Sequence, residues 1–151
     1  SAGEQLEVLG IQMEVLAPGE WKKKGDNDYS LVLYAEIEGA ALLLTGDSPT
    51  SSEKYDIPTC DILKVAHHGS QYATSDAFIQ QAQPRVAIIS VGLNSYGHPA
   101  QRVLDTLEKN GTTVIRTDES GCITLWLGKR KMALQAYHAP SLKPILLAYT
   151  R

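Results

Sequence analysis

Residues 61–70 read Asp-Ile-Leu-Lys-Val-Ala-His-His-Gly-Ser, a short apolar run that ends in two histidines, a glycine and a serine. A short apolar run bounded by turn-forming residues is typical of a buried strand. Ser75 is a favourable N-cap for the helix that follows, Val86–Val91 is a second apolar run, and Pro99 is expected to open another helix in its first turn. Thr113–Arg116 has strand character again. Strands that alternate with helices predict a layered α/β fold.

The segment upstream of this stretch has strand periodicity. Leu6–Leu16 alternates loosely and predicts one strand, and the polar segment Trp21–Tyr29 predicts a loop. Ser30–Glu38 alternates strictly, Gly39 predicts a tight turn, and Ala40–Thr45 predicts the returning strand of a hairpin. The second strand is apolar on both faces, which indicates a central, buried position. The hairpin makes the predicted sheet mixed.

The segment downstream predicts more antiparallel structure. Asp118–Gly121 predicts a turn, Cys122–Leu127 a returning strand and Lys131–Tyr137 a last strand. We interpret His138 as a surface residue. In the tail beyond it, the apolar piece Ile145–Tyr149 is ambiguous between strand and helix.

Length and composition restrict the class of protein. The chain has 151 residues, of which 43% are hydrophobic and 21% charged, so one globular domain or part of one is expected. The net charge of −3 gives no electrostatic footprint for nucleic acid, and we interpret Lys22–Lys24 and Lys129–Lys131 as solvated clusters. Cys60 and Cys122 form no metal-binding motif and are interpreted as small buried residues, although the sequence leaves one disulfide open.

Chemically capable side chains follow three successive predicted strands. They are Asp47 after Gly46, the pair His67 and His68, and Asn94 and His98 in the loop after Val91. In such folds functional residues collect beyond the carboxyl ends of strands. Imidazole and carboxylate together suit zinc, manganese or iron, and a carboxylate can bridge two metal ions.

Each of these residues also has a purely structural interpretation. Asp47 could be a turn or cap residue, the histidine pair could be satisfied by the backbone, and His98 could precede a helix without a further role. Ser70 and Ser75 are typical caps rather than nucleophiles. The combination at three strand ends favours a functional site.

The ordered set of motifs resembles the metallo-β-lactamase domain of ComEC-type DNA-uptake competence proteins. The resemblance covers about residues 6–127 and rests on Asn27–Leu33, Leu43–Asp47, Asp61–Ser70, Ile88–Pro99 and Arg116–Gly121. It implies that residues 1–138 are the C-terminal portion of such a domain and that residues 139–151 are a tail.

The resemblance implies an αββα sandwich, with a mixed sheet, flanking helices and a dinuclear metal site at its edge; this chain supplies the C-terminal half only. It assigns Asp47 to a bridging aspartate and His98 to the last metal-binding histidine. It gives His67 and His68 a catalytic role in phosphate binding or leaving-group protonation, for which an imidazole is suited, with metal ligation as the lesser alternative. Further implied contacts to substrate are made by Ser70, Ser75 and Asn94.

The chain departs from the family pattern in one large respect. The main metal motif, His-x-(His or Asp)-x-Asp-His, is absent from its 151 residues, as is a third-strand histidine, and both are expected upstream. Asp47 and His98 alone give a metal two protein ligands where about four are usual. We therefore expect two zinc or manganese ions in the complete domain, and weak or no metal binding and no activity in this chain alone. The missing half of the domain is an expected partner, and exposed sheet surface predicts self-association.

The resemblance implies a metal-dependent phosphodiesterase or nuclease that acts on DNA during uptake. It also implies a membrane-bound parent protein, with this domain outside the cytoplasm or at the membrane surface. Two alternatives stay open: a metallo-hydrolase of a non-nucleic-acid ester, and a non-catalytic scaffold or gating domain in DNA transport. The acidic net charge favours the alternatives, whereas the intact histidine motifs favour an enzyme.

Overall fold

The computed structural model describes residues 1–19, 25–128, 131–137 and 145–148, which form a mixed α/β structure around a seven-stranded sheet. The strands of this sheet lie in chain order: β1 (Gln5–Val8), β2 (Ile11–Ala17), β3 (Val32–Ile37), β4 (Ala40–Leu44), β5 (Ile62–Lys64), β6 (Val86–Ile89) and β7 (Thr113–Arg116). Neighbours from β1 to β4 are antiparallel, and neighbours from β4 to β7 are parallel. The predicted mixed sheet is therefore confirmed, and β4 occupies the predicted central position.

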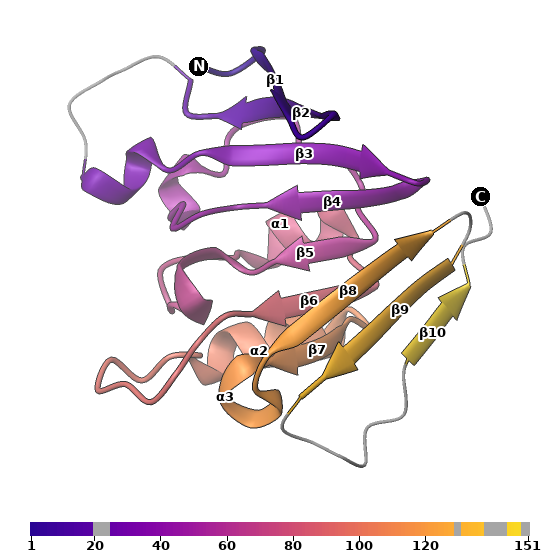
Figure 1. Ribbon diagram of the computed structural model, residues 1–151. Coiled ribbons are helices and arrows are strands. Elements are labelled where there is room, and N and C mark those ends of the chain that lie inside the picture. Colours follow the sequence, from indigo (N-terminus) through magenta and orange to yellow (C-terminus); the bar gives the residue numbers. More distant parts are fainter. Residues whose placement is uncertain (20–24, 129–130, 138–144, 149–151) are drawn as a thin grey trace.

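Two layers cover this sheet on opposite sides (Figure 1). Helices α1 (Asp76–Ala82) and α2 (Gln101–Lys109) lie behind it. In front lies a three-stranded antiparallel sheet in the order β10 (Ile145–Ala148), β9 (Lys131–Ala136) and β8 (Ile123–Gly128). Short helical turns connect the strands at Asp26–Tyr29, Thr50–Ser52, Ala66–Gly69 and α3 (Thr117–Ser120).

The alternation of side chains along β4 explains why both layers form. Ala41 and Leu43 pack in the cluster under the helices, together with Phe78 and Leu107. Ala40 belongs to the second cluster, between the two sheets. Successive side chains of a strand point to opposite faces, so a strand that is apolar throughout is buried on both.

The N-terminal strand prediction was wrong in one respect. Leu6–Leu16 is a hairpin of two strands rather than one strand. The turn falls at Leu9 (φ 52°) and Gly10 (φ 80°). Glycine adopts this left-handed conformation readily. Leu9 is not a typical turn residue, so the sequence pattern did not indicate a turn here.

The second helix also begins later than predicted. Pro99 does not lie in its first turn, because α2 begins at Gln101 with Ala100 as its N-cap. Pro99 instead lies at the end of the preceding loop and packs closely against Gly69. Ser75 caps α1 as predicted: its Oγ accepts a hydrogen bond from Phe78 N–H over 3.1 Å.

The two cysteines differ in burial. Both are free thiols; Cys60 is buried as predicted, but Cys122 is exposed, which corrects that interpretation. Cys122 directly precedes β8 at the surface end of the turn. Lys22–Lys24, Lys129, Arg130 and His138 lie outside the described residues.

No described residue forms a second layer on the front side of one part of the large sheet. The pairing register places eight apolar residues of β1–β3 on the same face as Leu42, yet none of the eight belongs to the cluster between the sheets. Val15 and Ala35 are buried, and the other six are half-buried or exposed: Leu6, Val8, Ile11, Met13, Leu33 and Ile37. Figure 1 shows the three-stranded sheet crossing in front of β5–β7 and leaving β1–β3 in view.

Within the described ranges, no helix is long and apolar enough to cross a membrane.

Candidate functional site

The loops that follow β4, β5 and β6 meet at one edge of the sheet. The backbone N–H of His67 donates to the carbonyl of Gly46 over 3.0 Å, which joins the first two loops. The N–H of Ala100 donates to the carbonyl of Gly69 over 2.8 Å, which joins the second and third. The three strand ends singled out from the sequence are therefore brought together.

The two adjacent histidines lie in an unusual backbone turn. His67 (φ 47°) and His68 (φ 55°) are both left-handed, and Gly69 (φ 80°) continues the conformation. Non-glycine residues rarely adopt this region, and such strain is found where the surroundings fix a side chain for a purpose. The turn thus presents two imidazoles that a regular helix or strand would direct elsewhere.

Hydrogen bonds orient both rings. Nδ1 of His68 lies 2.6 Å from the carbonyl oxygen of Ser90. Because a carbonyl only accepts, Nδ1 carries the proton and Nε2 is left as an acceptor. Nδ2 of Asn27 donates to Nδ1 of His67 over 3.3 Å, so the opposite assignment holds for His67. Its Nε2 is the protonated nitrogen.

His98 completes a group of three histidines. The ring centroids of His67 and His98 are 5.6 Å apart, and those of His67 and His68 are 6.3 Å apart. The ring of Tyr96 lies 5.9 Å from that of His98. Burial lowers the pKa of His98, and the proximity of His67 and then of His68, when those rings are protonated, lowers it further. His98 is therefore held toward its neutral form.

We expect His67→Gln to raise the pKa of His98, because it removes the larger of the two neighbouring charges. His68→Gln should raise it less. Since the pKa of His98 is lowered on folding from 6.5, the unfolded chain binds more protons below that value, and this contribution to native stability is lost as pH falls. An NMR titration of the histidine ring protons measures the shift. An unchanged His98 pKa in both variants would contradict the coupling.

A pocket of about 370 Å³ opens beside His67 and His98. It is lined by His67, Ser70, Gln71, Tyr72, Tyr96, Gly97, His98 and Ala100. Its residues come from the loops after β5 and β6, so it lies at the edge where functional residues were expected. The pocket can admit a small group next to two imidazoles.

Asp47 lies on the neighbouring loop beside a cation. Its backbone N–H donates to Ser30 Oγ over 3.2 Å, and its side chain is half-buried. Lys64 lies close enough for Asp47 to act on its titration: burial lowers the pKa of Lys64, and the negative charge of Asp47 opposes that shift. The Lys64 ammonium also donates to the carbonyl of Val65 over 3.0 Å. Lys64 was not assigned to the site from the sequence.

Among the residues that the structure describes, the donor set for a metal ion is incomplete. Across the described ranges, no three His, Cys, Asp or Glu side chains are grouped so that they could hold one ion. Asp47 and His98 have the right chemistry, but the residues present do not by themselves fit a zinc or manganese site. Metal binding through these two residues stays a prediction.

Ser70 and Ser75 both organise the backbone. Ser70 is buried, and its Oγ accepts from the N–H of Tyr72 over 3.3 Å. Ser75 caps α1, and its own N–H donates to the carboxylate of Glu53. Their predicted contact with substrate is not tested by these bonds; it stays a prediction.

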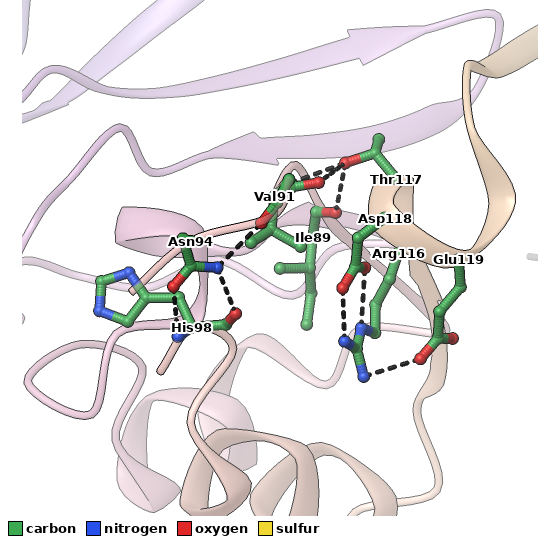
Figure 2. Close-up of polar contacts among 9 residues, drawn as sticks. Ile89, Val91, Asn94, His98, Arg116, Thr117, Asp118 and Glu119 are labelled. Atoms are coloured by element: carbon green, nitrogen blue, oxygen red, sulfur yellow. Dashed lines mark hydrogen bonds and ion pairs between the residues drawn. The ribbon is translucent and has the colours of Figure 1, made fainter. Parts of the chain in front are cut away.

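The side-chain amide of Asn94 makes hydrogen bonds within the loop that follows β6 (Figure 2). Its Oδ1 accepts from the N–H groups of Tyr96 (3.1 Å) and His98 (3.0 Å). Its Nδ2 donates to the carbonyls of Gly92 (2.9 Å) and His98 (2.7 Å). Four bonds from one side chain fix where the loop presents His98. Direct contact of Asn94 with substrate stays a prediction.

Two supporting residues were not identified from the sequence. Arg102, in the first turn of α2, donates to the carbonyls of Gln71, Ala73 and Thr74 and so ties down the loop after the histidine pair. Thr117 Oγ1 accepts from the N–H of Val91 (2.7 Å) and donates to its carbonyl (2.6 Å). The contacts of these two residues have no local sequence signal, because their partners are backbone atoms 26 or more positions away.

Ion pairs within the motif that begins at Arg116 stabilise its turn. Figure 2 shows Arg116 paired with Asp118 and Glu119. The two ion pairs measure 2.6 Å and 2.8 Å. The hydrogen bond from Arg116 holds the pKa of Asp118 below its usual range. This cluster stiffens the turn that carries Thr117, and through Thr117 it steadies the start of the His98 loop.

Comparison with known proteins identifies relatives of this chain. It is 41% identical over 127 residues to ComE operon protein 3 of Bacillus subtilis, 35% identical over 127 residues to competence protein ComA of Neisseria gonorrhoeae, and 30% identical over 139 residues to recombination protein 2 of Haemophilus influenzae. These matches cover 80%, 80% and 89% of this chain, but only 16%, 18% and 18% of the respective relatives. No family model matches the chain. The similarity to these named relatives, over most of its length, shows that the chain belongs to the ComEC-type competence proteins as a domain-sized segment.

Proposed function

We propose that this chain is the C-terminal part of a metallo-β-lactamase-type domain that hydrolyses phosphodiester bonds of DNA during competence-related DNA uptake. One relative is named competence protein ComA, and another is named ComE operon protein 3. The observation that carries the chemical part of the proposal is the group formed by His67, His68 and His98 beside a pocket.

In this proposal the histidine turn acts on the phosphate. His67 presents a protonated Nε2, which can donate to a phosphate oxygen or to the leaving oxygen. His68 is anchored through Nδ1 to Ser90, so its Nε2 can accept a proton. Asp47 and His98 are proposed metal ligands whose remaining partners come from another part of the domain. Asn94, Ser70 and Ser75 hold the backbone that presents these groups.

The arrangement of the layers supports the proposal that this chain is one half of a sandwich whose other half is missing. One helical layer, one large sheet and one smaller sheet are present, and an αββα sandwich adds strands and helices on the front side. The half-buried apolar face of β1–β3 is suited to receive those strands, because contiguous apolar surface is seldom left bare. When the upstream half is absent, we expect copies of this chain to associate through the same face.

The test compares this chain with a longer form that contains the upstream histidine motif. We expect the longer form to bind about two metal ions and to cleave DNA with manganese or zinc, whereas this chain does neither. His67→Ala and His98→Ala in the longer form should remove most of the cleavage. Glu108→Ala, an exposed residue of α2, is the control and should leave it unchanged. Equal cleavage in all three variants would overturn the proposal.

A second candidate is a non-catalytic gating or scaffold domain in DNA transport. It is favoured by the net charge of −3 and by the incomplete donor set in the part of the chain that the structure describes. Metal content separates the two functions. A longer form that is empty of metal and inert toward DNA supports the second.

A further inference from the structure

Two exposed tyrosines stand at the pocket beside the histidines. Tyr72 is 69% exposed and Tyr96 is 82% exposed, and both line the pocket that His67 and His98 share. They come from different loops, after β5 and after β6. Aromatic rings in water next to a candidate phosphate site are a feature that neither the fold nor the histidine chemistry requires.

Both tyrosines are presented by the same local device. The N–H of Tyr72 donates to the hydroxyl of Ser70, and the N–H of Tyr96 donates to the amide oxygen of Asn94, in each case two residues earlier. Such side-chain turns fix the backbone locally. Arg102 holds the carbonyl of Gln71, directly before Tyr72. The backbones are therefore set in advance, while both rings remain largely exposed.

This arrangement suits a flat aromatic ligand. A tyrosine ring has few rotatable bonds and offers a large contact area at low entropic cost. Stacking of a nucleobase on an aromatic side chain contributes about 1–3 kcal/mol per base and does not depend on base identity. The pocket volume of about 370 Å³ falls within the range of small-ligand sites.

The net charge of the chain also favours recognition of bases over recognition of the phosphate backbone. The chain carries a net charge of −3 and so offers the phosphate backbone no general attraction. The guanidinium of Arg102 is directed to three backbone carbonyls rather than into the pocket. Recognition through base faces is then the stronger available mode. Base faces are accessible in single strands and covered in duplexes.

We infer that Tyr72 and Tyr96 are a base-stacking pair that seats unpaired nucleotides of single-stranded DNA beside His67 and His98. The inference rests on the proposed function and adds the residues that select unpaired bases. Ser70 and Asn94 contribute indirectly, as positioning residues for the two tyrosines.

The test is binding of a fluorescent single-stranded oligothymidylate to this chain, followed by anisotropy. Tyr72→Ala and Tyr96→Ala should each weaken binding about 5- to 150-fold, which corresponds to about 1–3 kcal/mol. Tyr72→Phe and Tyr96→Phe keep the ring and should retain binding. Tyr137→Ala is the matched control, because Tyr137 is 64% exposed but directly follows β9 and does not line the pocket. An oligomer of abasic sites should bind wild type and the alanine variants equally weakly.

Three results would overturn the inference: no binding of oligothymidylate by the wild type, equal binding of the abasic oligomer, or equal affinity of the pocket variants and Tyr137→Ala. Cleavage by the longer form is a separate readout. Tyrosine-dependent binding without cleavage would uphold the stacking pair and remove the hydrolytic function. Histidine-dependent cleavage without any tyrosine effect on binding would do the reverse.

Discussion

Gly69→Ala is expected to destabilise the fold by about 2–5 kcal/mol and to displace the His98 loop. A Cβ at this position would lie 2.6 Å from Pro99 Cβ and 3.0 Å from Pro99 Cα, both far inside ordinary contact. Overpacking of this kind costs about 1–3 kcal/mol. Gly69 also has φ +80°, where a side chain adds about 1–2 kcal/mol of strain. The substitution therefore separates the two loops that carry the histidines.

Gly111→Ala is the matched control for this effect. Gly111 has φ +73°, but nothing lies within 4 Å of its added Cβ, so only the backbone strain of about 1–2 kcal/mol remains. Urea unfolding of both variants gives the two free energies of unfolding. Equal losses would show that the contact between Gly69 and Pro99 is not tight in solution.

Met132→Ala is expected to lower the free energy of unfolding by about 2–5 kcal/mol. Met132 is fully buried on β9 and lies in the cluster between the two sheets, with Ile62 and Val86 of the large sheet. Shortening it leaves a cavity in that interface and removes apolar contacts. The size of the loss thus reports how firmly the small sheet packs on the large one.

Gln135→Ala, on the opposite face of the same strand, provides the comparison. Gln135 is exposed, so its removal should change stability by no more than about 0.5 kcal/mol. Thermal or urea unfolding of both variants checks the difference. If Met132→Ala is as mild as Gln135→Ala, the two sheets do not form one cooperative unit.

The regular part of the fold could be predicted from periodicity and punctuation. Strict alternation in residues 30–38, the glycine at position 39 and the doubly apolar run that follows predict the hairpin β3–β4, which the structure contains. The alternation of strands and helices predicts the parallel strands β5–β7. The break at Leu9 escaped prediction because leucine is uncommon with positive φ.

The candidate site could be predicted only in its outline. Strand ends indicate where His67 and His98 should gather, because parallel strands share one carboxyl edge. The bonds that set the geometry, such as those from Arg102 and Thr117, join backbone atoms to side chains distant in the sequence. No local pattern encodes such partners. Pro99 illustrates the same limit: its place next to Gly69 is decided by tertiary packing rather than by helix propensity.

Because the two thiols differ in burial, their rates of alkylation report on opening of the native structure. Cys122 is exposed and open to alkylating reagents, whereas Cys60 is buried and its pKa is raised to about 12 by burial and by the charge of Asp61. Only the thiolate reacts at an appreciable rate, so a native molecule takes up one label quickly. The second label enters only when the core around Cys60 opens. The ratio of singly to doubly labelled chains therefore counts opening events without any engineered probe.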